Sequence, residues 1–105
     1  MSFRVSGKNI EVGEALRERV TARVAAAIEK YFDGRGFDGH VTVGREAYGF
    51  QTEAVLHLDS GIVISAEAMD ADPNLSADQA IEHLEKQLRR YHRKLKDHHA
   101  PAQSG

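Results

Sequence analysis

The feature that most constrains the fold is an apolar stripe near the C-terminal end of the chain. Its members step by four, three, four, three and four positions: Ala77, Ile81, Leu84, Leu88, Tyr91 and Leu95. At roughly 100° per residue, these side chains fall on one face of an α-helix. Ser76, with Gln79 three positions later, matches a capping box and predicts the start of this helix. The stripe has to be buried against another element.

A second helix is predicted over 14–32, and four short segments alternate with period two. The apolar stripe of this helix consists of Leu16, Val20, Val24, Ala27, Ile28 and Tyr31. The alternating segments predict strands around Phe3 and Val5, around Val41 and Val43, over 54–58, and over 62–68 after the hairpin signal Asp59-Ser60-Gly61. The order β-α-β-β-β-α predicts an α+β two-layer sandwich, a four-stranded sheet with both helices on one face. The other face would carry Arg4, Thr42, Glu53, His57 and Glu67 and remain exposed to water.

The length of 105 residues fits one domain. We predict the domain over 1–97 and a disordered tail or linker over 98–105. No apolar run approaches the ~20 residues of a membrane span. The chain has no cysteine, which excludes disulfides and thiolate chemistry and fits a cytoplasmic protein. The N-terminus lacks a signal-peptide pattern.

The net charge of −2 conceals a strong segregation of charge along the chain. Residues 46–85 contain nine acidic side chains and no lysine or arginine, whereas residues 86–105 contain six basic side chains against Asp97 alone. Such asymmetry favours a polyanionic partner, although a pI near 6.3 would by itself argue against nucleic acid.

The basic side chains of the last helix lie opposite its apolar stripe, on one face. They are Lys86, Arg89, Arg90, Arg93, Lys94 and Lys96. A second basic row lies beside the apolar stripe of the first helix and consists of Arg19, Arg23 and Lys30. Arg45 precedes two aromatic residues, Tyr48 and Phe50, that could stack on bases or anchor a turn. A solvated helix face is the alternative explanation. Like charges at i,i+4 destabilise a helix, which favours a binding role for phosphates.

Other chemistries find little support in the sequence. The six histidines show no His-x3-His spacing and no cysteines accompany them, so we expect no metal site. The serines lack a nucleophile-elbow context, and no glycine-rich loop precedes a helix. We therefore expect no enzyme, no cofactor and no small-molecule substrate.

Three segments resemble the ribosome hibernation promoting factor family, which includes ribosome-associated inhibitor A and is also described as the sigma-54 modulation protein family. They are Ser6-Gly7-Lys8-Asn9-Ile10-Glu11-Val12 with Glu14-Ala15-Leu16-Arg17, then Glu29-Lys30-Tyr31-Phe32, and Leu84-Glu85-Lys86-Gln87-Leu88-Arg89-Arg90-Tyr91 with Lys94. The resemblance covers about residues 3–97. It implies a β-α-β-β-β-α fold akin to double-stranded RNA-binding domains.

The resemblance also implies a function. A member of this family would bind the small ribosomal subunit in the cleft for messenger and transfer RNA, inhibit translation and preserve idle ribosomes under stress. Lys86, Arg89, Arg90, Arg93 and Lys94 would contact ribosomal RNA phosphates, assisted by Arg19, Arg23, Lys30 and Arg45. The alternative is a regulator whose basic helix docks on an acidic protein surface, as in sigma-factor modulation. The chain would be either a short member or the N-terminal domain of a long one.

Overall fold

The chain forms six elements in the predicted order. The computed structural model describes residues 2–32, 36–59 and 61–104, and side chains through Lys94. The elements are β1 (Ser2–Lys8), α1 (Glu14–Phe32), β2 (Phe37–Glu46), β3 (Gly49–Leu58), β4 (Val63–Asp70) and α2 (Pro73–Ser104). The order β-α-β-β-β-α is therefore confirmed. Ser60 of the hairpin signal lies outside the described residues.

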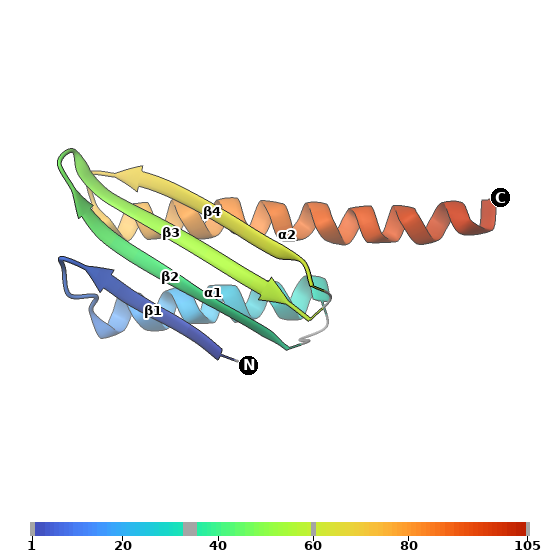
Figure 1. Cartoon of the computed structure of the whole chain (residues 1–105), viewed down its shortest axis with the longest axis horizontal. Coiled ribbons are helices and arrows are strands. Elements are labelled where there is room, and N and C mark those ends of the chain that lie inside the picture. Colours follow the sequence, from blue (N-terminus) through green and yellow to red (C-terminus); the bar gives the residue numbers. More distant parts are fainter. Residues whose placement is uncertain (1, 33–35, 60, 105) are drawn as a thin grey trace.

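The sheet has the strand order β1-β2-β3-β4. Strand β1 pairs parallel to β2, because α1 carries the chain back across the sheet before β2 begins. The other two pairings are antiparallel. In Figure 1 both helices lie on the same side of the sheet, which confirms the two-layer α+β sandwich.

The core lies between the helices and the covered face of the sheet. One row of this face runs through Val5, Val41, Ala54 and Ala66, which are partners in the register. The two apolar stripes meet this face and are buried from Leu16 to Ile28 in α1 and from Ala77 to Leu88 in α2. Tyr31 and Tyr91 pack half-buried at its margin, and the side chain of Leu95 lies outside the described residues.

The opposite face of the sheet is open, as predicted. Arg4, Glu53, His57 and Glu67 are exposed there, whereas Thr42 is half-buried. Glu53 and Glu67 are direct partners in the register between β3 and β4. Like charges in such a pair repel each other, a cost that water on the open face reduces.

The predicted start of α2 is wrong. The helix begins at Pro73, three residues before Ser76. The Asp72 carboxylate accepts hydrogen bonds from the backbone N–H groups of Asn74, at 2.7 Å, and Leu75, at 3.4 Å. Asp72 is thus the N-cap, and proline suits the first helical position because that position needs no N–H donor.

Ser76 and Gln79 have other partners than those of a capping box. The Ser76 hydroxyl is completely buried, lies 2.8 Å from the Thr52 hydroxyl and donates to the Ala68 carbonyl at 3.2 Å. The Gln79 amide donates to the Asp70 carboxylate at 2.9 Å. These contacts fix the first turns of α2 to β3 and β4.

The C-terminal half of α2 extends beyond the sheet (Figure 1). The helix continues to Ser104, and the domain division after residue 97 stays a prediction. Within the part of the chain that the structure describes, no helix combines the length and the apolar character that crossing a membrane requires.

Candidate nucleic-acid interface

The basic face of α2 is solvent-exposed. We use this name for Lys86, Arg89, Arg90, Arg93 and Lys94, all of which are exposed. The helix directs them away from the core because Leu84 and Leu88 on its opposite side are buried in it. None of the five forms an ion pair with a described side chain. Lys96, which was predicted to extend this face, has a side chain outside the described residues.

The arginines of α1 are in a different situation, because acids of α2 hold them. Arg19 forms an ion pair with Asp78 at 3.0 Å. Arg23 reaches Glu85 at 2.8 Å and Asp78 at 3.8 Å. Arg19 is exposed and Arg23 is half-buried, and the ion pairs partly neutralise the positive charge of both within the protein. Their predicted contact with RNA stays a prediction.

Two further predicted residues, Lys30 and Arg45, lie far from each other. The Lys30 ammonium lies 5.3 Å from the centre of the Tyr31 ring, beside α2. Arg45 is the partner of Phe50 in the register, and Phe50 is the partner of Asp70, just before α2 begins. The basic face starts about 20 Å further along α2, at 1.5 Å per residue. The structure therefore does not bring Arg45 to the basic face.

The turn that follows Arg45 presents one aromatic side chain to water. Tyr48 is 89% exposed, whereas Phe50 is half-buried. The sequence left open whether these residues stack on bases or anchor the turn. The structure leaves only Tyr48 fully available for contact with a partner.

A groove lies between α1 and α2, next to the basic face. Its walls and floor come from both helices: Ala26, Ala27, Lys30, Tyr31, Glu82, Glu85, Lys86 and Arg89. The ion pairs of Arg23 bridge the helices on one side of it, and on the other His92 hydrogen-bonds the Tyr31 carbonyl at 2.9 Å. We call this the interhelical groove. The sequence did not reveal it, because it depends on how two helices far apart in the chain are aligned.

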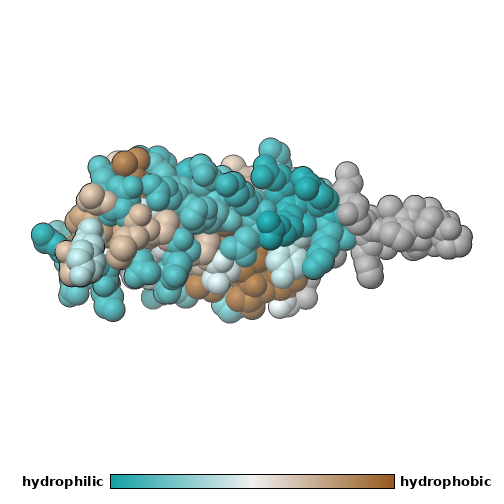
Figure 2. All heavy atoms as spheres, turned by 90° about the horizontal axis from the view of Figure 1, so that it is seen from above, coloured by the Kyte–Doolittle hydropathy of each residue, from teal (hydrophilic) through white to brown (hydrophobic). Residues whose placement is uncertain are grey.

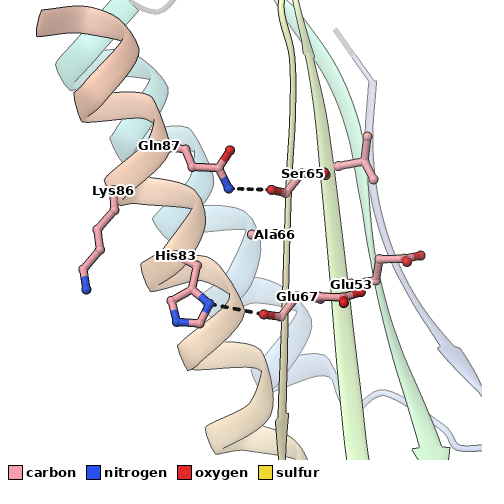
Figure 3. Close-up of a pocket in the computed structure, with 8 residues that line it drawn as sticks. Glu53, Ser65, Ala66, Glu67, His83, Lys86 and Gln87 are labelled. Carbon is pink, nitrogen blue, oxygen red and sulfur yellow. Dashed lines mark hydrogen bonds between the residues drawn. The ribbon is translucent and has the colours of Figure 1, made fainter.

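A second hollow lies at the free edge of β4, where α2 passes alongside (Figure 3). His83 hydrogen-bonds the Glu67 carbonyl at 3.2 Å, and Gln87 donates to the Ser65 carbonyl. Both side chains come from α2 and use the backbone acceptors of the strand. Figure 3 shows Lys86 directed away from these contacts.

The exposed cations of the basic face determine what this surface can bind. Among the described residues, no three histidine, aspartate or glutamate side chains gather as metal ligands. Seen from above, hydrophilic residues cover most of the visible surface, with a smaller group of hydrophobic ones (Figure 2). Exposed cations on a rigid helix suit phosphate groups, which accept hydrogen bonds from arginine and lysine.

Comparison with known proteins assigns the chain to a family. The family model described as "Sigma 54 modulation protein / S30EA ribosomal protein" matches residues 3–96. The chain belongs to this family. The resemblance to the ribosome hibernation promoting factor or sigma-54 modulation protein family, inferred from three segments, is thereby confirmed.

Relatives in the S30EA family are similar over nearly the whole chain. A "Ribosome hibernation promotion factor" of Bradyrhizobium diazoefficiens is 48% identical over 95% of this chain, and one of Rhizobium meliloti is 46% identical over 94%. The chain spans about half the length of these two relatives, 49% and 52%. The "Ribosome hibernation promoting factor" of Escherichia coli K12 is 38% identical and is covered over 100% of its length.

Solved structures support the same fold. The N-terminal domain of Thermus thermophilus Protein Y superposes with a TM-score of 0.74 at 27% identity, covering 87% of this chain and 99% of that one. A ribosomal subunit interface protein of Coxiella burnetii gives a TM-score of 0.73 at 24% identity and shows the likeness of fold. The chain therefore has the same fold as these two structures.

Proposed function

We propose that the chain acts as a ribosome hibernation factor. It binds the small ribosomal subunit in the cleft for messenger and transfer RNA, inhibits translation and preserves idle ribosomes under stress. Its partners are 16S ribosomal RNA and neighbouring ribosomal proteins, and it acts without catalysis. The relatives named as hibernation factors support the role.

The basic face of α2 is the observation that carries the proposal. Five cations project from one side of a single helix, and none has an acidic partner among the described side chains. Repulsion between neighbours at i,i+4 destabilises the helix, and RNA phosphates would relieve it. A protein that neutralises about six phosphates loses about 10³-fold or more in affinity between 50 and 200 mM salt. The proposal therefore predicts strongly salt-dependent binding.

Sedimentation of small ribosomal subunits with the chain tests the proposal. The triple variant Arg89→Glu, Arg90→Glu, Arg93→Glu should lose co-sedimentation, because it places acids where phosphates bind. It should keep its fold, because all three side chains are exposed.

A matched control reverses three exposed cations on other elements: Arg4→Glu, Lys8→Glu and Arg17→Glu. The change in net charge is the same, so retained binding by the control assigns the effect to position rather than total charge. Undiminished co-sedimentation of the folded triple variant of α2 would refute the binding site.

The family description also mentions modulation of sigma 54, which favours a second candidate. In that alternative, the basic face of α2 docks on an acidic protein surface. Messenger and transfer RNA analogues should displace the chain from ribosomes if the first proposal holds. Binding to ribosomes that resists an excess of these analogues would favour the protein partner.

A further inference from the structure

We propose that the interhelical groove receives one unstacked base of the RNA strand that the basic face holds. This inference rests on the proposed function and deepens it, because it adds contact with a base to contact with phosphates. A bare phosphate surface needs no groove, no aromatic ring and no carboxylate, whereas this site has all three.

The groove is open because two alanines form its floor. Ala26 is exposed and Ala27 is buried, and neither fills the space between the helices. On one side Arg23 bridges to Glu85 at 2.8 Å, and on the other His92 reaches the Tyr31 carbonyl at 2.9 Å. Both contacts join α1 to α2 on either side of the gap, and the buried stripes of the two helices fix their alignment against the sheet. The opening is thus part of the packed fold.

The cations around the groove suit the backbone of a nucleotide. Lys86 and Arg89 line one wall and are also members of the basic face, so a strand lying on that face passes the opening. Lys30 lines the other wall and is exposed. Phosphates on either side of an inserted base would have cations within reach on both helices.

Tyr31 supplies a ring for the base. The His92 ring lies 5.7 Å from the Tyr31 ring at 53°, and the hydrogen bond to the Tyr31 carbonyl further fixes this part of α1. The Lys30 ammonium lies 5.3 Å from the centre of the Tyr31 ring, and its long exposed side chain can move onto a phosphate as a base takes its place. Bases splayed out of single-stranded RNA commonly stack on such rings.

Glu82 gives the groove a preference among bases. Its carboxylate is exposed on the wall, and no ion pair with it exists among the described side chains. A carboxylate only accepts hydrogen bonds, so it favours bases with an exocyclic amino group. Cytosine, adenine and guanine carry such an amino group, whereas uracil offers only its ring N3–H as a donor. The groove should therefore prefer a base with an amino group, such as cytosine or adenine, to uracil.

The test fills the groove without changing any charge. Ala26→Leu should weaken binding of a fluorescein-labelled ten-residue oligocytidylate about tenfold, measured by polarisation, because it removes the stacked base. The slope of affinity against salt should stay unchanged, because the phosphate contacts remain. Ala25→Leu on the same helix is the matched control. Ala25 is also exposed, does not line the groove and should leave binding unchanged.

A second variant tests the base preference. The wild-type chain should bind oligocytidylate at least about fivefold more tightly than oligouridylate. Glu82→Gln should reduce this ratio towards one, because an amide can also donate to uracil.

The inference is overturned if Ala26→Leu binds oligocytidylate like the wild type. It is also overturned if Ala26→Leu weakens binding of double-stranded RNA or of polyglutamate as much as it weakens binding of oligocytidylate, because neither of these offers an unstacked base. A wild-type chain that binds no oligonucleotide would overturn it as well. Sedimentation with small subunits separates the two proposals. If the wild type fails to sediment with subunits while Ala26→Leu still affects oligocytidylate, the ribosomal role fails and the base site stands.

Discussion

Ser76 gives the sharpest test of what fixes α2 to the sheet. Ser76 and Thr52 are both 0% exposed, and their hydroxyl oxygens lie 2.8 Å apart. Because Ser76 donates to the Ala68 carbonyl at 3.2 Å, Thr52 is the donor in the contact between the hydroxyls. Ser76→Ala therefore removes the acceptor of a buried hydroxyl that water does not reach.

The expected cost follows from that unpaired hydroxyl. A buried polar group without a partner costs about 1–3 kcal/mol, so Ser76→Ala should lower the free energy of unfolding by about 2 kcal/mol. For a domain of this size, that change lowers Tm by about 10 °C. Thr52→Val should cost less, about 1 kcal/mol, because Ser76 keeps its bond to the Ala68 carbonyl.

The double variant tests whether the unpaired Thr52 hydroxyl causes the cost of Ser76→Ala. Thr52→Val with Ser76→Ala removes both hydroxyls and leaves an apolar contact, so its cost should fall below the sum of the single variants by about 1 kcal/mol. Urea unfolding followed by circular dichroism measures all three, and the slope with urea should not change. A Ser76→Ala variant within about 0.5 kcal/mol of the wild type, or strictly additive costs, would refute the reasoning.

Three further changes in stability can be measured by urea unfolding. Asp72→Ala should cost about 1 kcal/mol because it removes the N-cap of α2, and Asp72→Asn, which keeps an acceptor, should cost much less. Arg23→Ala should lower the free energy of unfolding by less than about 1 kcal/mol, because the side chains of its ion pair with Glu85 are about one-third exposed. A larger loss of stability that persists in 1 M salt would contradict this expectation. Gly49→Ala should lower the free energy of unfolding by about 1–3 kcal/mol, because the φ of 146° at this position is strained for alanine. The new Cβ would also lie 2.7 Å from the Asp70 carbonyl oxygen. An unchanged midpoint of urea unfolding would contradict this expectation.

Local periodicity was sufficient to predict the order of the elements and much of the core. The stripe from Leu16 to Ile28 gave α1 the bounds that the structure has, Glu14–Phe32. The alternation around Val41 and Val43 placed both side chains inward, and each is 0% exposed. Such patterns are local, because a side chain's neighbours three, four or two positions away determine which face it occupies.

Contacts between distant segments were not predictable in the same way. Ser76 and Asp72 both have the chemistry of an N-cap, and only the contact of Ser76 with β3 shows that it serves another purpose. The basic face of α2 follows from the spacing within one helix. The ion pair between Arg23 and Glu85 joins residues 62 positions apart, and the interhelical groove depends on that alignment.

The contacts at the free edge of β4 bear on how the protein behaves at high concentration. An uncovered edge strand offers its backbone groups to a strand of another molecule and so promotes aggregation. Here His83 and Gln87 already occupy the carbonyls of Glu67 and Ser65, and α2 lies alongside. The pair of Glu67 with Glu53 adds negative charge close to the same edge. This edge of the sheet is thus protected from pairing with a strand of another copy, even in a crowded solution.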